Sequence, residues 1–167
     1  MNWKVLACSL CLLGSLTVNV PSLAQYAPTY VEKSGLTLTC YARHRASGSF
    51  VPVIGVNGNA RGYWGYATYQ PNGQPVIIFD PQFLLPYPDV VARYVYYHEC
   101  AHLKYETSNE IEASCKGLID MRSAGHVTTA GENALKRVHY SLGPLEPKYG
   151  GSGKALWDLT VKCANGN

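Results

Sequence analysis

Two kinds of hydrophobic pattern divide the chain near residue 80. Before this point, apolar and β-branched residues form short runs separated by turn residues, as is typical of β-strands. After it, apolar residues recur at spacings of three and four, as is typical of amphipathic helices. The order of the two patterns predicts an α+β domain, in which a short antiparallel sheet precedes a helical half.

The strand half is predicted as a small antiparallel meander. Asn57-Gly58 is a strong hairpin signal, because both residues tolerate positive φ. A second turn is expected over Pro71 to Pro75, and Asp80-Pro81 ends the last strand. The strands themselves are expected over residues 36–41, 50–56, 62–69 and 76–79.

The helical half begins after Pro86 and Pro88, and a glycine-rich loop is expected over 143–153. Thr129-x-x-Glu132 is a capping box that predicts the start of one helix. The first helix is apolar until residue 98, so the residues that follow should lie at a core-facing end. The helices are expected over residues 88–105, 110–125, 129–143 and 154–163.

Residues 1–24 are predicted to be a signal peptide. Lys4 provides a positive charge, Val5 to Val18 is mostly apolar, and Ser22-Leu23-Ala24 offers small residues for cleavage after Ala24. The apolar run is too short to span a membrane comfortably, so we expect no stable membrane span after cleavage. The remaining 25–167 would be a single exported domain, either periplasmic or secreted.

Composition and net charge narrow the interpretation of the fold and of the binding partner. The hydrophobic content of 47% is sufficient for a core in one domain. Removal of Lys4 with the leader lowers the net charge from +3 to +2, which is 13 basic minus 11 acidic residues. Because no block of lysines and arginines stands out, we expect no nucleic-acid partner.

Four cysteines remain after the leader, and an even number in an exported chain predicts two disulfides. Three pairings are possible. Cys100 and Cys115 lie on consecutive predicted helices, and a helical hairpin would bring them together. The expected bonds are therefore Cys100–Cys115 and Cys40–Cys163, the second tying the two ends of the domain.

The pentapeptide His98-Glu99-Cys100-Ala101-His102 is the most informative motif. On a helix, residues four apart share one face, so the two imidazoles could bind one metal ion. Glu99 would lie close enough to handle a proton of a water molecule on that ion. A catalytic zinc site typically has three protein ligands, which requires a third one here.

Two glutamates are candidates for the third ligand. Glu106 continues the same helix and would lie about two turns from His98, which is too far. Glu110 opens the next helix, and a helix returning beside the first would bring its carboxylate to the histidines. In the alternative interpretation, Thr107-x-x-Glu110 is a capping box and Glu110 only caps that helix.

Residues 94–119 resemble the gluzincin metallopeptidases, in which H-E-x-x-H is followed by a helix carrying Asn-Glu-x-x-x-Asp. Asn109-Glu110-Ile111-Glu112-Ala113-Ser114 matches the second motif, with Ser114 in place of Asp. The chain also resembles small exported bacterial proteins with H-E-C-A-H and a second cysteine placed like Cys115. The resemblance implies a zincin-like fold, Zn²⁺ as cofactor, and His98, His102 and Glu110 as its ligands. It further implies that residue 114 contacts a ligand histidine.

The gap between His102 and Glu110 is short for this family and requires a sharp turn over Tyr105 to Ser108. Of the other histidines, His139 next to Tyr140 is the strongest candidate for stabilising an oxyanion, although no spacing connects it with the motif. His44 and His126 have no partner spacing.

The sequence predicts an exported zinc-dependent peptidase that acts on a peptide or protein substrate, with Glu99 as the general base. The strand 76–79 is expected to pair with extended substrate. One alternative is a non-catalytic, metal-containing binding module of the cell envelope. Another is a disulfide-linked structural protein in which the motif has no metal.

Overall fold

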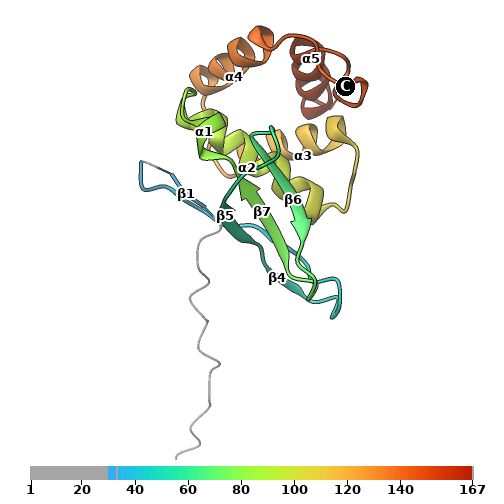
Figure 1. Cartoon of the computed structure of the whole chain (residues 1–167). Helices are drawn as coiled ribbons and strands as arrows, with labels where there is room; N and C mark the ends of the chain where they lie inside the picture. Colours follow the sequence, from blue (N-terminus) through green and yellow to red (C-terminus); the bar gives the residue numbers. More distant parts are fainter. Residues whose placement is uncertain (1–29, 33, 167) are drawn as a thin grey trace, which may run out of the picture.

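The strand half precedes the helical half, as predicted, and the protein has an α+β fold (Figure 1). The computed structural model describes residues 30–32 and 34–166, so the expected signal peptide lies outside the described residues. The strands are β1 Tyr30–Val31, β2 Thr37–Leu38, β3 Tyr41–Arg43, β4 Phe50–Pro52, β5 Ile54–Asn57, β6 Gly65–Tyr69 and β7 Pro75–Phe79. The helices are α1 Pro81–Leu84, α2 Asp89–Lys104, α3 Glu110–Ser123, α4 Thr129–Ser141, the 3₁₀ helix η1 Pro147–Tyr149 and α5 Gly153–Ala164.

The central sheet has the strand order β5-β7-β6. β6 and β7 form the antiparallel hairpin predicted at Pro71 to Pro75, closed by a hydrogen bond from Gln70 N–H to Gln74 O. β5 runs parallel to β7, and Gly58 N–H donates to Phe79 O. The hairpin predicted at Asn57-Gly58 is therefore wrong, because β5 does not pair with β6.

The strand order follows from the composition of β7. Its run Val76-Ile77-Ile78-Phe79 is almost wholly buried, whereas β5 and β6 are partly exposed. A continuous apolar strand gains most from neighbours on both sides, so it takes the central position. The prediction that 76–79 pairs with substrate is therefore wrong, because both edges of β7 already carry a strand.

Helix α2 lies between two apolar clusters. Val95 and Tyr96 pack toward the sheet with Ile77 and Phe79. Val91 and Tyr94 pack on another side, in a cluster whose other members are Leu118, Met121, Leu135 and Trp157. Burial on both sides explains why the sequence before His98 is apolar almost all round. It also places the motif of residues 98–102 in the interior of the fold.

Helix α3 approaches α2 closely at Gly117. A Cβ at this position would lie 2.9 Å from the backbone nitrogen of His98 and 2.9 Å from the carbonyl carbon and oxygen of Tyr97. Any side chain would push the helices apart, so glycine permits this approach. Ala113 and Ser114, one turn earlier, are also buried on this helix. The small residues of α3 thus hold its first turn beside the motif.

The disulfide pairing differs from the prediction. The bonds are Cys40–Cys100, with a Cα–Cα distance of 5.9 Å, and Cys115–Cys163, with 5.8 Å. The expected Cys100–Cys115 and Cys40–Cys163 bonds are therefore wrong. Residues two apart on a helix point about 200° away from each other. Since His98 faces α3, Cys100 faces the sheet and meets Cys40 instead.

The two disulfides attach different parts of the fold to the central helices. Cys40–Cys100 joins the segment before β3 to α2, and Cys115–Cys163 joins α3 to α5. Figure 1 shows α4 and α5 gathered at the end of the sheet that lies away from β4. Within residues 30–32 and 34–166, no helix combines the length and apolar character needed to cross a membrane.

Candidate metal centre

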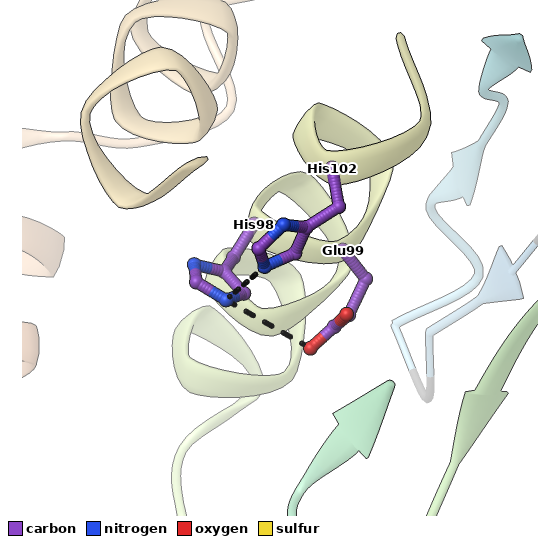
Figure 2. A group of neighbouring side chains, drawn as sticks. All are labelled: His98, Glu99 and His102. Atoms are coloured by element: carbon purple, nitrogen blue, oxygen red, sulfur yellow. Dashed lines mark hydrogen bonds and ion pairs between the residues drawn. The ribbon is translucent and has the colours of Figure 1, made fainter. Parts of the chain in front are cut away.

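The two histidines of the motif share one face of α2. Their Nε2 atoms lie 3.1 Å apart, and their ring centroids are separated by 4.7 Å. Figure 2 shows both imidazoles and the carboxylate of Glu99 reaching from the same helix toward a common point. Each histidine side chain is largely buried, with 13% and 16% of its surface exposed. The predicted convergence of the two rings is therefore present.

The Nδ1 atoms of both rings have partners that orient them. His102 Nδ1 lies 2.8 Å from the carbonyl oxygen of Thr107, and His98 Nδ1 lies 3.0 Å from Ser114 Oγ. Because a carbonyl oxygen only accepts, Nδ1 of His102 carries the proton. A neutral His102 then has its free lone pair on Nε2, the atom directed at His98. Ser114 occupies the position at which the resemblance implied a histidine partner.

Glu110 brings a carboxylate to the two histidines. Its Oε2 lies 3.2 Å from His98 Nε2 and 3.2 Å from His102 Nε2. The capping-box alternative does not describe this turn, since Asn109 is the N-cap and accepts from the N–H groups of Ile111 and Glu112. The side chain of Glu110 therefore does not cap the helix, and it faces the histidines.

The chain returns from α2 to α3 through the predicted sharp turn. Glu106 adopts φ of 53°, a left-handed conformation that is uncommon for residues other than glycine. A single left-handed residue after a helix reverses the chain direction within a few residues. This reversal is what places Glu110 beside His102 although only eight positions separate them.

The second oxygen of Glu110 is held by a residue that the sequence did not indicate. Lys148 Nζ, from η1, lies 3.1 Å from Glu110 Oε1. Burial alone would raise the pKa of Glu110, but hydrogen bonds to His102, His98 and Lys148 hold that pKa well below its usual range. Conversely, burial alone would lower the pKa of His102, and its contact with Glu110 raises that pKa above the ordinary value.

Glu99 lies on the sheet side of the histidines. It is buried, and its Oε1 is 3.9 Å from His98 Nε2. Burial raises the pKa of its carboxyl group, although the nearby histidine charges and a hydrogen bond from the backbone of Ala67 on β6 oppose this. His98, Glu99 and His102 form a group whose ligand atoms lie within 4.8 Å of one another and could hold a metal ion.

Glu110 is better placed than Glu99 to complete such a site. It approaches both Nε2 atoms equally, at 3.2 Å, whereas the carboxylate of Glu99 lies 3.9 Å from the nearer one. Both carboxylates line the larger cavity, and Glu99 also lines the second one. The two carboxylates therefore differ mainly in their distance from the histidine Nε2 atoms.

Two cavities meet at this group. One, of about 790 Å³, extends along β6 from Lys148 to Arg43 and includes Glu99, His102 and Glu110 in its lining. The other, of about 450 Å³, is lined mainly by aromatic and leucine side chains. His98 and Ser114 border this second cavity. The cluster is thus accessible to a molecule from outside.

Tyr149, next to Lys148, lines both cavities. Burial and the charge of Glu110 raise the pKa of its hydroxyl to about 12. Like Lys148, it lies in the loop between α4 and α5, where no spacing related it to the motif. The sequence predicted the glycine-rich loop that contains Tyr149, but it did not indicate that this residue lies near the motif.

The remaining histidines have other surroundings. His139 is 1% exposed, its Nδ1 lies 2.8 Å from Leu135 O, and it borders the second cavity. Tyr140 faces elsewhere, with its hydroxyl bound to Asp158. His126 Nδ1 contacts the hydroxyl of Tyr97, and His44 lines the far end of the larger cavity.

Comparisons of this chain with models of protein families, with curated proteins and with solved structures find no match. Inferences about function therefore rest on the residues and their geometry.

Proposed function

We propose that the protein is an exported zinc-dependent peptidase, with His98, His102 and Glu110 as the zinc ligands. The observation that carries the proposal is the convergence of their three donor atoms, whose separations are 3.1, 3.2 and 3.2 Å. Donors that bind one tetrahedral zinc ion at about 2.0–2.1 Å would lie about 3.3 Å apart. Two imidazoles and one carboxylate are also a usual donor set for catalytic zinc.

The ligands are already oriented for this role. Thr107 O and Ser114 Oγ hold the Nδ1 atoms, which leaves the Nε2 atoms directed at the shared position. Lys148 holds one oxygen of Glu110 and leaves the other toward the histidines. Contacts of this kind to the ligands usually strengthen metal binding, because they fix the tautomer and the direction of the lone pairs.

Glu99 is proposed as the general base. A bound zinc ion would supply a polarised carbonyl and an acidified water molecule. Glu99 would accept the proton of that water at its carboxylate and later pass it to the leaving amine. Burial raises its pKa, and a carboxyl group with a raised pKa is better suited to both steps near neutral pH.

The edge strand β6 is proposed to hold the extended substrate, in place of β7. Asp80 N–H donates to Trp64 O, and Gln70 N–H donates to Gln74 O. In this register every second residue of β6, at positions 64, 66, 68 and 70, directs its backbone groups at β7. By that alternation, the backbone groups of Gly65, Ala67 and Tyr69 point away from β7. They line the larger cavity beside Glu99. The backbone of Ala67 already makes a hydrogen bond to Glu99, so an added strand would pair with the outward groups of Gly65 and Tyr69.

Substitution of Glu99 tests this function. Glu99→Gln should retain about one zinc per chain, measured by inductively coupled plasma mass spectrometry, because Glu99 is not a ligand. Its cleavage of a diverse peptide library, followed by mass spectrometry, should fall at least about 100-fold because the proton acceptor is lost. Glu112→Gln is the matched control, since Glu112 is exposed on α3 and bonds Thr107.

An active Glu99→Gln variant, or wild-type protein that does not bind zinc, would contradict the proposal. Wild-type protein that binds zinc and peptides but cleaves none would support the alternative, a non-catalytic binding module of the cell envelope. The neutral hydroxyl of Ser114 at His98 favours that alternative, because a carboxylate at this position would support the ligand more strongly. The two disulfides are typical of an oxidising compartment, consistent with export to the periplasm or beyond.

A further inference from the structure

One end of the larger cavity is basic. Arg43, His44 and Arg45 come from β3 and the turn that follows it, and they line the same cavity as Glu99, His102 and Glu110. None of these three basic residues belongs to the proposed metal centre or to its supporting contacts. They are therefore in a position to contact a molecule bound in the larger cavity.

The two arginines differ in their partners. Arg43 Nε lies 3.7 Å from Glu106 Oε1, and its guanidinium donates to the carbonyl of Gly48. Arg45 has no carboxylate within 4.0 Å among residues 30–32 and 34–166, and its guanidinium carbon lies 4.0 Å from the ring centroid of Tyr69. An aromatic ring orients a guanidinium without neutralising it. Arg45 thus offers a fixed and uncompensated positive charge to the cavity.

The backbone that carries Arg45 is also fixed relative to β6. Its N–H donates to the carbonyl of Gly73, in the β6–β7 turn, at 3.0 Å. Gly73 has φ of 90°, and a Cβ there would lie 2.9 Å from the nitrogen of Ala46. The loop bearing Arg45 is therefore packed directly against the end of the hairpin.

The distance between Arg45 and Glu99 can be followed along β6. Glu99 contacts the backbone of Ala67, and Arg45 covers Tyr69, two residues further along the strand. Two residues of a strand span about 6.6 Å and return to the same face of the sheet. A peptide laid along β6 with its reacting bond at Glu99 would place a side chain about two residues away beside Arg45.

We propose that Arg45 and Tyr69 form a subsite for an acidic side chain, about two residues from the bond that is cleaved. This inference rests on the proposed peptidase function. It makes the preferred substrate a peptide with Asp or Glu at that position, recognised by a charge-assisted hydrogen bond to the guanidinium. Arg43 contributes less, because Glu106 already offsets its charge.

The test uses full-length zinc-loaded protein and the library peptide that it cleaves fastest. Versions of this peptide carry Glu, Gln or Lys at the second residue on either side of the cleaved bond. At one of the two positions, kcat/KM should be about 2- to 5-fold higher for Glu than for Gln, the range expected of a solvent-accessible ion pair. Arg45→Gln should abolish this ratio, and Arg45→Glu should invert it in favour of Lys.

Arg61→Gln is the matched control. Arg61 also lies over a tyrosine, 5.6 Å from the ring of Tyr66, but it does not line the larger cavity. This variant should keep the preference for Glu. An equal kcat/KM for Glu and Gln peptides in the wild type, or a preference that persists in Arg45→Gln, overturns the subsite.

Binding separates failure of the subsite from failure of the peptidase function. Fluorescein-labelled alanine octapeptides carrying one Glu, Gln or Lys are titrated into the Glu99→Gln variant, with and without Arg45→Gln. If the wild type cleaves nothing, a Glu preference that depends on Arg45 still supports the acidic subsite. If the Glu, Gln and Lys peptides bind with equal affinity, or if none binds measurably, the acidic subsite is overturned, whether or not the wild type cleaves peptides.

Discussion

The hydroxyl oxygen of Ser114 lies 3.0 Å from Nδ1 of His98, and it joins the N-terminal half of α3 to the face of α2 that carries the two histidines. Ser114 is 1% exposed, so water does not replace it in this contact. The hydrogen bond between Ser114 Oγ and His98 Nδ1 orients the ring so that Nε2 is directed at His102 and Glu110. The same contact would be stronger with a carboxylate, because the charge would raise the basicity of the imidazole.

Substitutions of Ser114 should therefore change zinc affinity in opposite directions. Ser114→Ala removes the hydrogen-bond partner of His98 and should weaken binding about 10-fold, and Ser114→Asp should strengthen it about 10-fold. Competition with a chromophoric chelator measures both. Ser123→Ala, an exposed serine of the same helix, should bind as the wild type does. Equal affinities for all four proteins would show that the contact has no influence on the metal.

Gly117→Ala should destabilise the protein by about 1–3 kcal/mol, because an added methyl group must displace the backbone of α2. The clash involves the backbone nitrogen of His98, so zinc affinity should also fall. Urea unfolding and chelator competition give the two values. Gly143→Ala is the control, since nothing lies within 4 Å of a Cβ at that position. A neutral Gly117→Ala variant would contradict the close approach of α3 to α2.

Peptide mapping under non-reducing conditions should recover Cys40 linked to Cys100 and Cys115 linked to Cys163. The sequence separation of the second bond is 48, and loss of such a link lowers the free energy of unfolding by about 4 kcal/mol. The double variant Cys115→Ala, Cys163→Ala should show this loss in thermal unfolding. Recovery of a Cys100–Cys115 peptide would instead contradict the orientation of α2.

His139 should make the fold sensitive to mild acid. Burial lowers the pKa of this imidazole in the folded protein. As the pH falls below the unfolded pKa, about 6.5, the unfolded chain binds a proton that the folded protein does not. Stability therefore decreases with falling pH by up to about 1.4 kcal/mol per unit, until the folded pKa is reached. His139→Leu should flatten this slope in urea unfolding between pH 5 and 6.5, whereas an unchanged slope would assign the acid sensitivity to other groups.

Much of the fold follows from local patterns that the sequence displays directly. Helices α2, α3, α4 and α5 were predicted close to their observed bounds. The spacing of apolar residues indicated α2 and α3, because each buries one or more faces of a regular 3.6-residue repeat, and a capping box indicated α4. The residue that caps each helix was harder to predict. Thr128 rather than Thr129 caps α4, and Asn109 rather than a Thr107–Glu110 capping box caps α3, because neighbouring polar residues compete for the same N–H groups.

The strands were harder to arrange than to locate. A turn such as Asn57-Gly58 permits a hairpin, but pairing depends on which strand gains most from two neighbours. Because Ile77 and Phe79 are buried in the core, β7 takes the central position, with β5 and β6 on its two sides. This choice moved the free edge, and with it the proposed substrate strand, from β7 to β6.

The amino-acid sequence by itself determined that His98 and His102 share one helical face, since a spacing of four on a helix allows no other result. It also indicated Glu110, through its position at the start of the next helix. Only the tertiary structure decided the partners of Cys100, the contact of Lys148 with Glu110 and the place of Arg45 beside β6. These depend on how helices and loops pack over long sequence separations, and a local repeat carries no information about such packing.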